Sequence, residues 1–69
     1  MRNLYYKVGE HVLLASGMAK IEGWNGHIVR LTIEDYEGNI EERFLTRSEI
    51  AREIYELDGK NYKVFIEKE

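Results

Sequence analysis

The chain contains no cysteine and no proline among its 69 residues. Without cysteine it can form neither disulfides nor thiolate zinc sites, and we expect no metal and no other cofactor. A chain of this length buries only about 60% of the surface that it exposes when unfolded. Its stability must therefore come from dense packing of its aromatic side chains (five Tyr, two Phe and one Trp) or from self-association.

Long apolar runs are also missing. No segment approaches the roughly 20 apolar residues that span a bilayer. Residues 1–7 lack the apolar stretch of a signal peptide. We therefore expect a cytoplasmic protein that folds as one small β domain, residues 1–69, since a chain without cysteine also suits a reducing compartment.

Positive charge is scarce in the second half of the chain. The formal net charge is −3, and five acids with no base lie between Glu34 and Glu42. Proteins that bind duplex nucleic acid neutralise phosphates with clustered lysines and arginines, and no such cluster occurs here in sequence. Nucleic acid is therefore a disfavoured partner. We expect the acids to solvate and protect a sheet edge, and the alternatives are a hard cation or a basic partner surface.

Six glycines divide the chain into short segments. Short strands between turn signals are typical of an all-β meander or barrel. We expect a mostly all-β fold: a small SH3-like barrel or curled antiparallel meander of five to six short strands, with at most one short helical segment near 47–52. In the first such strand, Val12 and Leu14 share one face, and Ser16-Gly17 forms the next turn.

The hairpin around residues 24–26 has two possible registers. A two-residue Asn25-Gly26 turn mixes charged and apolar side chains on both faces. A three-residue loop at 24–26 instead pairs Ile21 with Val29 and separates the core face from the solvent face. We prefer the three-residue loop, which places Trp24 in the loop.

The following hairpin turns near Glu37-Gly38. Pairing Tyr36 with Asn39 sets Leu31 opposite Phe44, so that Phe44 joins Ile21, Val29 and Leu31 on the inner face. The same register sets Glu42 opposite Ile33, and a carboxylate among apolar residues indicates a sheet edge or a bulge.

Thr46-Arg47-Ser48-Glu49 has the form of a helix capping box. One interpretation is a helix that runs through Leu57. The other is a single helical turn near 47–52, followed by a hairpin of residues 53–57 and 61–66. Asp58-Gly59 suits either a hairpin turn or a helix end. We prefer the short turn with the hairpin.

The first third of the chain resembles a known family. Tyr6-Lys7-Val8-Gly9-Glu10-His11-Val12-Leu13, followed by Ser16-Gly17-Met18-Ala19-Lys20-Ile21, resembles the first strands of SH3-like small barrels. The pattern is most similar to the RNA-polymerase-interacting domain of the CarD family of transcription regulators, which also occurs in transcription-repair coupling factors. The resemblance implies a small barrel, a role in transcription regulation and a protein partner, with RNA polymerase as the candidate.

No group of residues has the spacing of a catalytic site. His11 and His27 lack a third metal ligand, and we expect both to be ordinary strand residues. Ser16 lies in a turn and Ser48 in the capping segment, with no base placed beside either. We therefore expect that the chain is not an enzyme.

These observations favour a non-catalytic protein-interaction module. Trp24 either contacts the partner, as tryptophans often do, or folds back over an open end of the barrel. Two alternatives stay open: nucleic-acid binding with aromatic stacking through Lys7, Lys20, Arg30 and Arg43, and a homo-oligomer formed through edge strands. The partner-binding residues that we predict are Trp24, Asn25, His27, Arg30, Tyr36 and Arg43.

Overall fold

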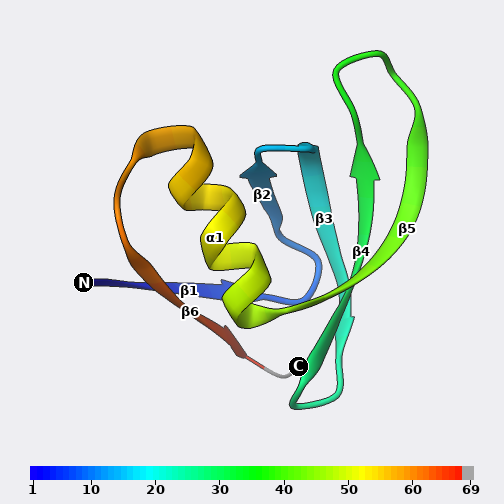
Figure 1. Cartoon of the computed structure of the whole chain (residues 1–69). Helices are drawn as coiled ribbons and strands as arrows, with labels where there is room; N and C mark the ends of the chain where they lie inside the picture. The colour runs from blue at the N-terminus through cyan, green and yellow to red at the C-terminus, as the bar shows by residue number, and fades with distance from the viewer. Residues whose placement is uncertain (68–69) are drawn as a thin grey trace.

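The computed structural model describes residues 1–67 and contains two β-sheets and one helix (Figure 1). The fold class is therefore mostly β, as predicted. The elements follow one another as β1 (Arg2–Lys7), β2 (His11–Leu14), β3 (Gly17–Trp24), β4 (Ile28–Glu34), β5 (Ile40–Thr46), α1 (Arg47–Asp58) and β6 (Tyr62–Glu67).

Strands β2 to β5 form an antiparallel meander in the order β2-β3-β4-β5. Val12 and Leu14 are both buried, which confirms the inner face predicted for β2. The turn after β2 leads into Gly17, whose φ of +142° suits only glycine. A Cβ at Gly17 would also collide with the carbonyl oxygen of Glu34 on the neighbouring β4. The antiparallel sheet thus depends on a close approach between the backbones of β3 and β4 at Gly17.

The predicted register of the hairpin between β3 and β4 is wrong by two residues. Ile21 pairs with Leu31, and Trp24 pairs with Val29 as the last residue of β3. A bulge at Glu22 shifts the register between these pairs and turns Trp24 toward the core face. Because a shift of two preserves the alternation, Ile21, Val29 and Leu31 still face inward, as predicted.

The predicted register of the hairpin between β4 and β5 is wrong by one residue, which reverses the faces of β5. Phe44 lies opposite Arg30 and is 60% exposed, whereas Leu45 is buried. The cause is the turn, where the Asp35 carboxylate accepts hydrogen bonds from the backbone N–H groups of Glu37 and Asn39. The loop between β4 and β5 therefore has three residues, whereas the predicted register gave it two.

The preference for a hairpin after residue 52 is wrong, because α1 continues to Asp58. The predicted capping box is present: the Thr46 hydroxyl accepts from the Glu49 N–H, and the Glu49 carboxylate accepts from the Thr46 N–H. Gly59 ends the helix in the left-handed conformation (φ 72°), and its N–H donates to the Tyr55 carbonyl. No helix within residues 1–67 is long and apolar enough to cross a membrane.

Strands β1 and β6, near the two ends of the chain, pair in parallel with Leu4 opposite Val64. This pairing is not among our predictions. Helix α1 packs against β6, β2 and β5 and so lies across the space between the two sheets (Figure 1). The core contains no buried polar or charged residue among those described and consists of Val12, Leu14, Ala19, Ile21, Val29, Leu31, Ile33, Leu45, Ile50, Ile54, Val64 and Ile66.

Candidate binding surfaces

Trp24 is half-buried and packs against the core. The guanidinium carbon of Arg47 lies 5.6 Å from the centre of its ring, a cation–π arrangement. The indole Nε1 is buried and has no hydrogen-bond partner within residues 1–67. Most of the ring therefore covers the end of the core where α1 begins.

Asn25 and His27 form the turn between β3 and β4. The Asn25 Oδ1 accepts hydrogen bonds from the backbone N–H groups of His27 (2.9 Å) and Ile28 (2.8 Å). Such a side-chain cap mimics a backbone turn. Asn25 therefore has a structural role in this turn, and the His27 side chain is exposed beside it.

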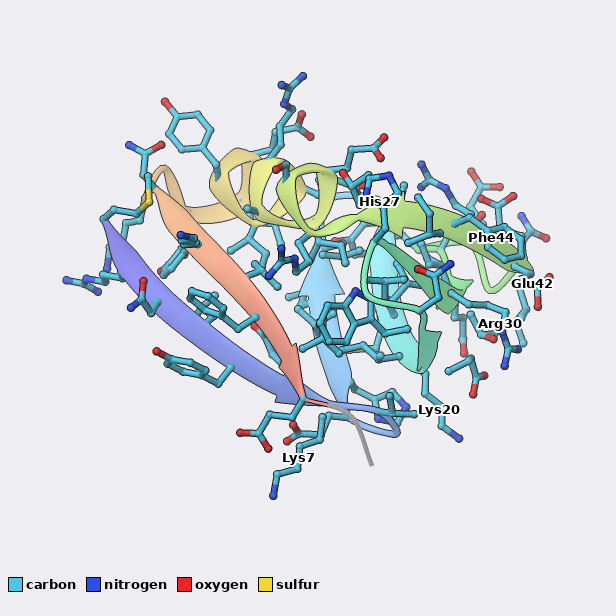
Figure 2. All side chains as sticks on the ribbon, turned by 90° about the horizontal axis from the view of Figure 1, so that it is seen from below. Lys7, Lys20, His27, Arg30, Glu42 and Phe44 are labelled. Carbon is cyan, nitrogen blue, oxygen red and sulfur yellow. The ribbon has the colours of Figure 1, made fainter. Side chains whose placement is uncertain are left out.

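Arg30 lies on the outer face of the four-stranded sheet, beside Phe44 (Figure 2). Its Nη1 lies 3.6 Å from the Glu42 Oε2 in an exposed ion pair. Arg30 also borders a small hollow of about 290 Å³, lined by Gly23, Trp24, Asn25, Ile28, Arg30 and Phe44. Three of the predicted contact residues thus meet at this end of the sheet.

Arg43 and Tyr36 lie at the opposite end of the sheet, near the turn between β2 and β3. Arg43 Nη1 donates to Ser16 Oγ (3.1 Å) and lies 3.8 Å from Glu53 Oε2. The Tyr36 hydroxyl donates weakly to the Leu14 carbonyl at 3.4 Å. The six predicted contact residues therefore do not form one surface.

The four cations predicted for nucleic-acid binding are also dispersed. Lys20 and Arg30 lie on the four-stranded sheet, and Lys7 lies at the end of β1 (Figure 2). Arg43, on β5, forms an ion pair with Glu53 of α1. Acidic side chains such as Glu42 stand among the cations, so these residues present no continuous basic face.

The titratable side chains within residues 1–67 do not assemble a site of their own. No three His, Asp or Glu side chains there lie close enough together to hold a metal ion. The Asp35 carboxylate, in the acidic segment, accepts hydrogen bonds from its own turn, led by the Asn39 backbone N–H, and these lower its pKa. Its oxygens are thus used to close the hairpin.

A groove of about 830 Å³ runs along one flank of α1. Arg47, Ala51 and Tyr55 follow one another at four-residue spacing along its helical wall. The other wall is formed by the beginning of β6. The full lining is Met1, Arg47, Ser48, Ala51, Arg52, Tyr55, Glu56, Asn61, Tyr62, Lys63 and Val64. We call this hollow the α1–β6 groove.

The α1–β6 groove is basic, although the chain as a whole is acidic. Its helical wall carries the cations Arg47 and Arg52 against one acid, Glu56. Lys63 also borders the groove, with its ammonium 5.4 Å from the centre of the Phe65 ring. The ion pairs within residues 1–67 involve Arg30 and Arg43, and none involves a cation of the groove. The groove therefore combines apolar and aromatic lining with two arginines, Arg47 and Arg52, neither of which forms an ion pair within 4 Å among residues 1–67.

A hydrogen bond fixes the wall formed by Tyr62. Its hydroxyl donates to Asp58 Oδ2 at 2.7 Å, linking the end of α1 to the start of β6. This bond raises the pKa of Tyr62. The Lys60 backbone N–H and the Tyr62 hydroxyl lower the pKa of Asp58, since both donate to its carboxylate. The wall is therefore held in a defined position within the single chain.

The groove was not predicted, because residues 53–57 were assigned to a strand. The four-residue spacing of the apolar Ile50 and Ile54, both buried in the structure, was the signal for a helix here. The opposite wall carries no comparable signal, because β6 lies beside the groove only through its pairing with β1 at the other end of the chain. No protein-family model matches the chain, and comparison with curated proteins and with solved structures gives no match either.

Proposed function

We propose that the chain is a non-catalytic protein-interaction module, and that its α1–β6 groove binds an acidic segment of a partner protein. The observation that carries this proposal is the excess of cations in the groove of an otherwise acidic chain. A concave site with apolar lining and a few polar groups is the usual form of a binding site.

The lining suits a protein ligand. Tyrosine and arginine are enriched at protein interfaces, because both combine large contact area with hydrogen-bonding groups. The groove carries Tyr55 and Tyr62 together with Arg47 and Arg52. The cations would attract a ligand of opposite charge and orient it, while the aromatic rings would supply the apolar contact. An acidic segment with apolar side chains between its carboxylates meets both demands.

Titration with synthetic peptides tests the proposal. The probes are short peptides of alternating Glu and Val, with peptides of alternating Lys and Val as the control. Trp24 is the sole tryptophan and lies under Arg47 at the end of the groove, so its fluorescence reports occupancy. We expect the acidic peptide to bind, with an affinity that falls as salt is added.

Variants locate the binding. Arg52→Glu reverses one charge of the groove and should weaken binding of the acidic peptide at least tenfold, about 1.4 kcal/mol. Lys20→Glu makes the same change on the outer face of the four-stranded sheet and should leave binding unchanged. Equal affinities in Arg52→Glu and the unmodified chain, or no binding of acidic peptides, would disprove the assignment of the groove.

The resemblance to the CarD family adds a partner to test, since it implies contact with RNA polymerase. The same fluorescence assay with purified polymerase and with Arg52→Glu tests that prediction. Nucleic-acid binding is not proposed, because two of the four cations predicted for it lie beside carboxylates, Arg30 beside Glu42 and Arg43 beside Glu53.

A further inference from the structure

The two sheets have four outer edges, and three of them are closed to a foreign strand. Strand β2 is only four residues long. Strand β5 carries the charged run Glu41, Glu42 and Arg43, and Arg43 points inward to Ser16 and Glu53. Short edges and inward charges are common means of preventing edge pairing.

The outer edge of β6 is closed by burial. The Arg2 N–H donates to the Asn61 carbonyl (3.1 Å), which shows which backbone groups of β6 face β1. Because the groups alternate along a strand, those of Tyr62, Val64 and Ile66 point to the opposite edge. Val64 and Ile66 are only 3% and 5% exposed, with α1 packed against the strand.

The outer edge of β1 is open. Arg2 faces β6, so the backbone groups of Asn3, Tyr5 and Lys7 point away from it. Lys7 is satisfied by the next turn: its N–H donates to Glu10 Oε1 (2.6 Å), and its carbonyl accepts from the Glu10 N–H (3.0 Å). Within residues 1–67 no backbone partner stands opposite Asn3 or Tyr5, and β1 is the outermost ribbon on its side of the molecule (Figure 2).

Strand β1 also lacks the features that protect an edge. It contains no proline and no bulge, and its only charged residues, Arg2 and Lys7, stand at its two ends. Tyr5, in the middle, is 62% exposed and stacks on Phe65 of β6. A six-residue edge with an aromatic centre is a template for another strand.

We propose that this edge pairs with the β1 strand of a second copy of the chain, antiparallel and centred on Leu4. In this register Asn3 of one copy exchanges backbone hydrogen bonds with Tyr5 of the other, and Tyr5 does so with Asn3. Leu4 stands opposite Leu4 of the second copy, and Arg2 opposite Tyr6. No two side chains of like charge face each other directly within β1, which would destabilise the pair.

A second copy fits because the open segment is complementary to itself. Its unpaired groups belong to Asn3 and Tyr5, which lie symmetrically about Leu4, so a two-fold axis satisfies all of them. The axis is perpendicular to the sheet and keeps both inner faces on the same side. Two two-stranded sheets, each marginal alone, become one sheet of four strands. The dimer does not use the α1–β6 groove and stands independently of the proposed function.

Sedimentation equilibrium and amide hydrogen exchange test the dimer. We expect the mass to rise from 8.2 kDa toward twice that value as concentration increases, and the amides of Asn3 and Tyr5 to become protected in parallel. Asn3→Pro removes a donor that the single chain does not use, so it should give a folded monomer. The matched control is Glu42→Pro in the middle of β5, which should still dimerise. A wild-type chain that is monomeric at millimolar concentration would overturn the proposal, as would an Asn3→Pro variant that dimerises normally.

Cross-linking tests the register and does not depend on the proline variants. Residues that face each other in a non-hydrogen-bonded antiparallel pair have Cα atoms about 4.5 Å apart, within the range of a disulfide. Because the chain has no cysteine, Leu4→Cys should oxidise to a covalent dimer in high yield at low protein concentration. Phe44→Cys, exposed on β5, should cross-link no faster than chance collision. Equal rates for the two variants would contradict the Leu4-centred register.

Discussion

The two sheets of this domain are stabilised in different ways. The antiparallel sheet is built from neighbouring segments, and side chains such as Asp35 and Asn25 close its turns. The parallel pair joins β1 to β6, close to opposite ends of the chain, and covers its inner face with α1. A two-stranded sheet is marginal alone. The first sheet therefore depends on local pairing, and the second depends on its packing against the helix.

The edge strands of the two sheets also differ in how well they are protected from pairing with another chain. Arg43 on β5 points toward Ser16 and Glu53, so a charge lies on the inner side of the edge strand. Strand β1 has Leu4 and Tyr6 half-buried and Tyr5 exposed, and the one charge on its inner face, Arg2, stands at the end of the strand beside Tyr62. The comparison indicates that the antiparallel sheet is complete in the single chain, whereas the parallel sheet is open to extension.

The largest expected effect is on the free energy of unfolding, which Leu31→Ala should lower much more than Leu4→Ala. Leu31 is completely buried in the central pair of the antiparallel sheet, whereas Leu4 on β1 is half-buried. Removing a buried leucine costs about 2–5 kcal/mol of unfolding free energy, and we expect Leu31→Ala to lie in that range. Leu4→Ala should cost less than half as much. Urea unfolding followed by circular dichroism measures both.

Hydrogen exchange extends this comparison within the unmodified chain. Amides of β4 should exchange only through global unfolding, and those of β6 through a smaller opening that detaches β6 from β1. If Leu4→Ala were as destabilising as Leu31→Ala and both sheets exchanged at one rate, the sheets would form a single cooperative unit and the contrast would be wrong.

The local parts of the antiparallel sheet were predictable from the sequence because period-two alternation survives a register error of two. Ile21 and Val29 were therefore placed correctly, although their pairing was not. The error of one residue that misplaced Phe44 arose at a turn, where the Asp35 side chain chooses the loop length. The carboxylate that the predicted register placed among apolar residues indicated a sheet edge, and β5 is an edge strand, although its true register sets Glu41, not Glu42, opposite Ile33.

The parallel pair and the groove were not predictable in the same way. Tyr62 and Arg2 are brought together by the whole fold, and no local sequence pattern in β1 or β6 predicts that the two strands pair. The second half of α1 was not predicted for a simpler reason: a glycine such as Gly59 suits the end of a helix as well as the turn of a hairpin. The four-residue spacing of Ile50 and Ile54, which α1 buries, was the better guide.

Gly17→Ala tests how tightly the antiparallel sheet is closed. Gly17 has a φ of +142°, and an added Cβ would collide with the Glu34 carbonyl oxygen. We expect a loss of about 1–3 kcal/mol in unfolding free energy from backbone strain. Gly26→Ala is the matched control, since it has a positive φ but open space around it. Equal losses in the two variants would show that the close approach of β3 and β4 contributes nothing beyond the torsional strain.

Glu53→Ala breaks the link between α1 and the antiparallel sheet. Glu53 Oε1 accepts hydrogen bonds from the N–H (3.0 Å) and the hydroxyl (2.7 Å) of Ser16, and Arg43 lies beside it. Loss of these partners should cost about 1–3 kcal/mol, against no more than about 0.5 kcal/mol for the exposed Glu56→Ala. Because β6 depends on α1, Glu53→Ala should also speed exchange in β6 more than in β4. Uniform acceleration would refute that dependence.

Glu49→Gln should have the smallest effect, visible mainly as a change in pH dependence. The Thr46 backbone N–H, which donates to Glu49 Oε1 at 2.9 Å, is the main cause of the lowered pKa of Glu49. The unfolded chain therefore binds this proton more readily, so the stabilisation is present above the unfolded pKa and is lost as pH falls through the folded pKa. Glutamine keeps the hydrogen bond without the charge. Unfolding should thus show the variant less stable at neutral pH, with the difference shrinking in acid as the carboxylate of the unmodified chain becomes protonated. Since Glu49 joins β5 to α1, a difference independent of pH would mean that the charge at this junction contributes nothing and that the hydrogen bonds alone hold the helix on its sheet.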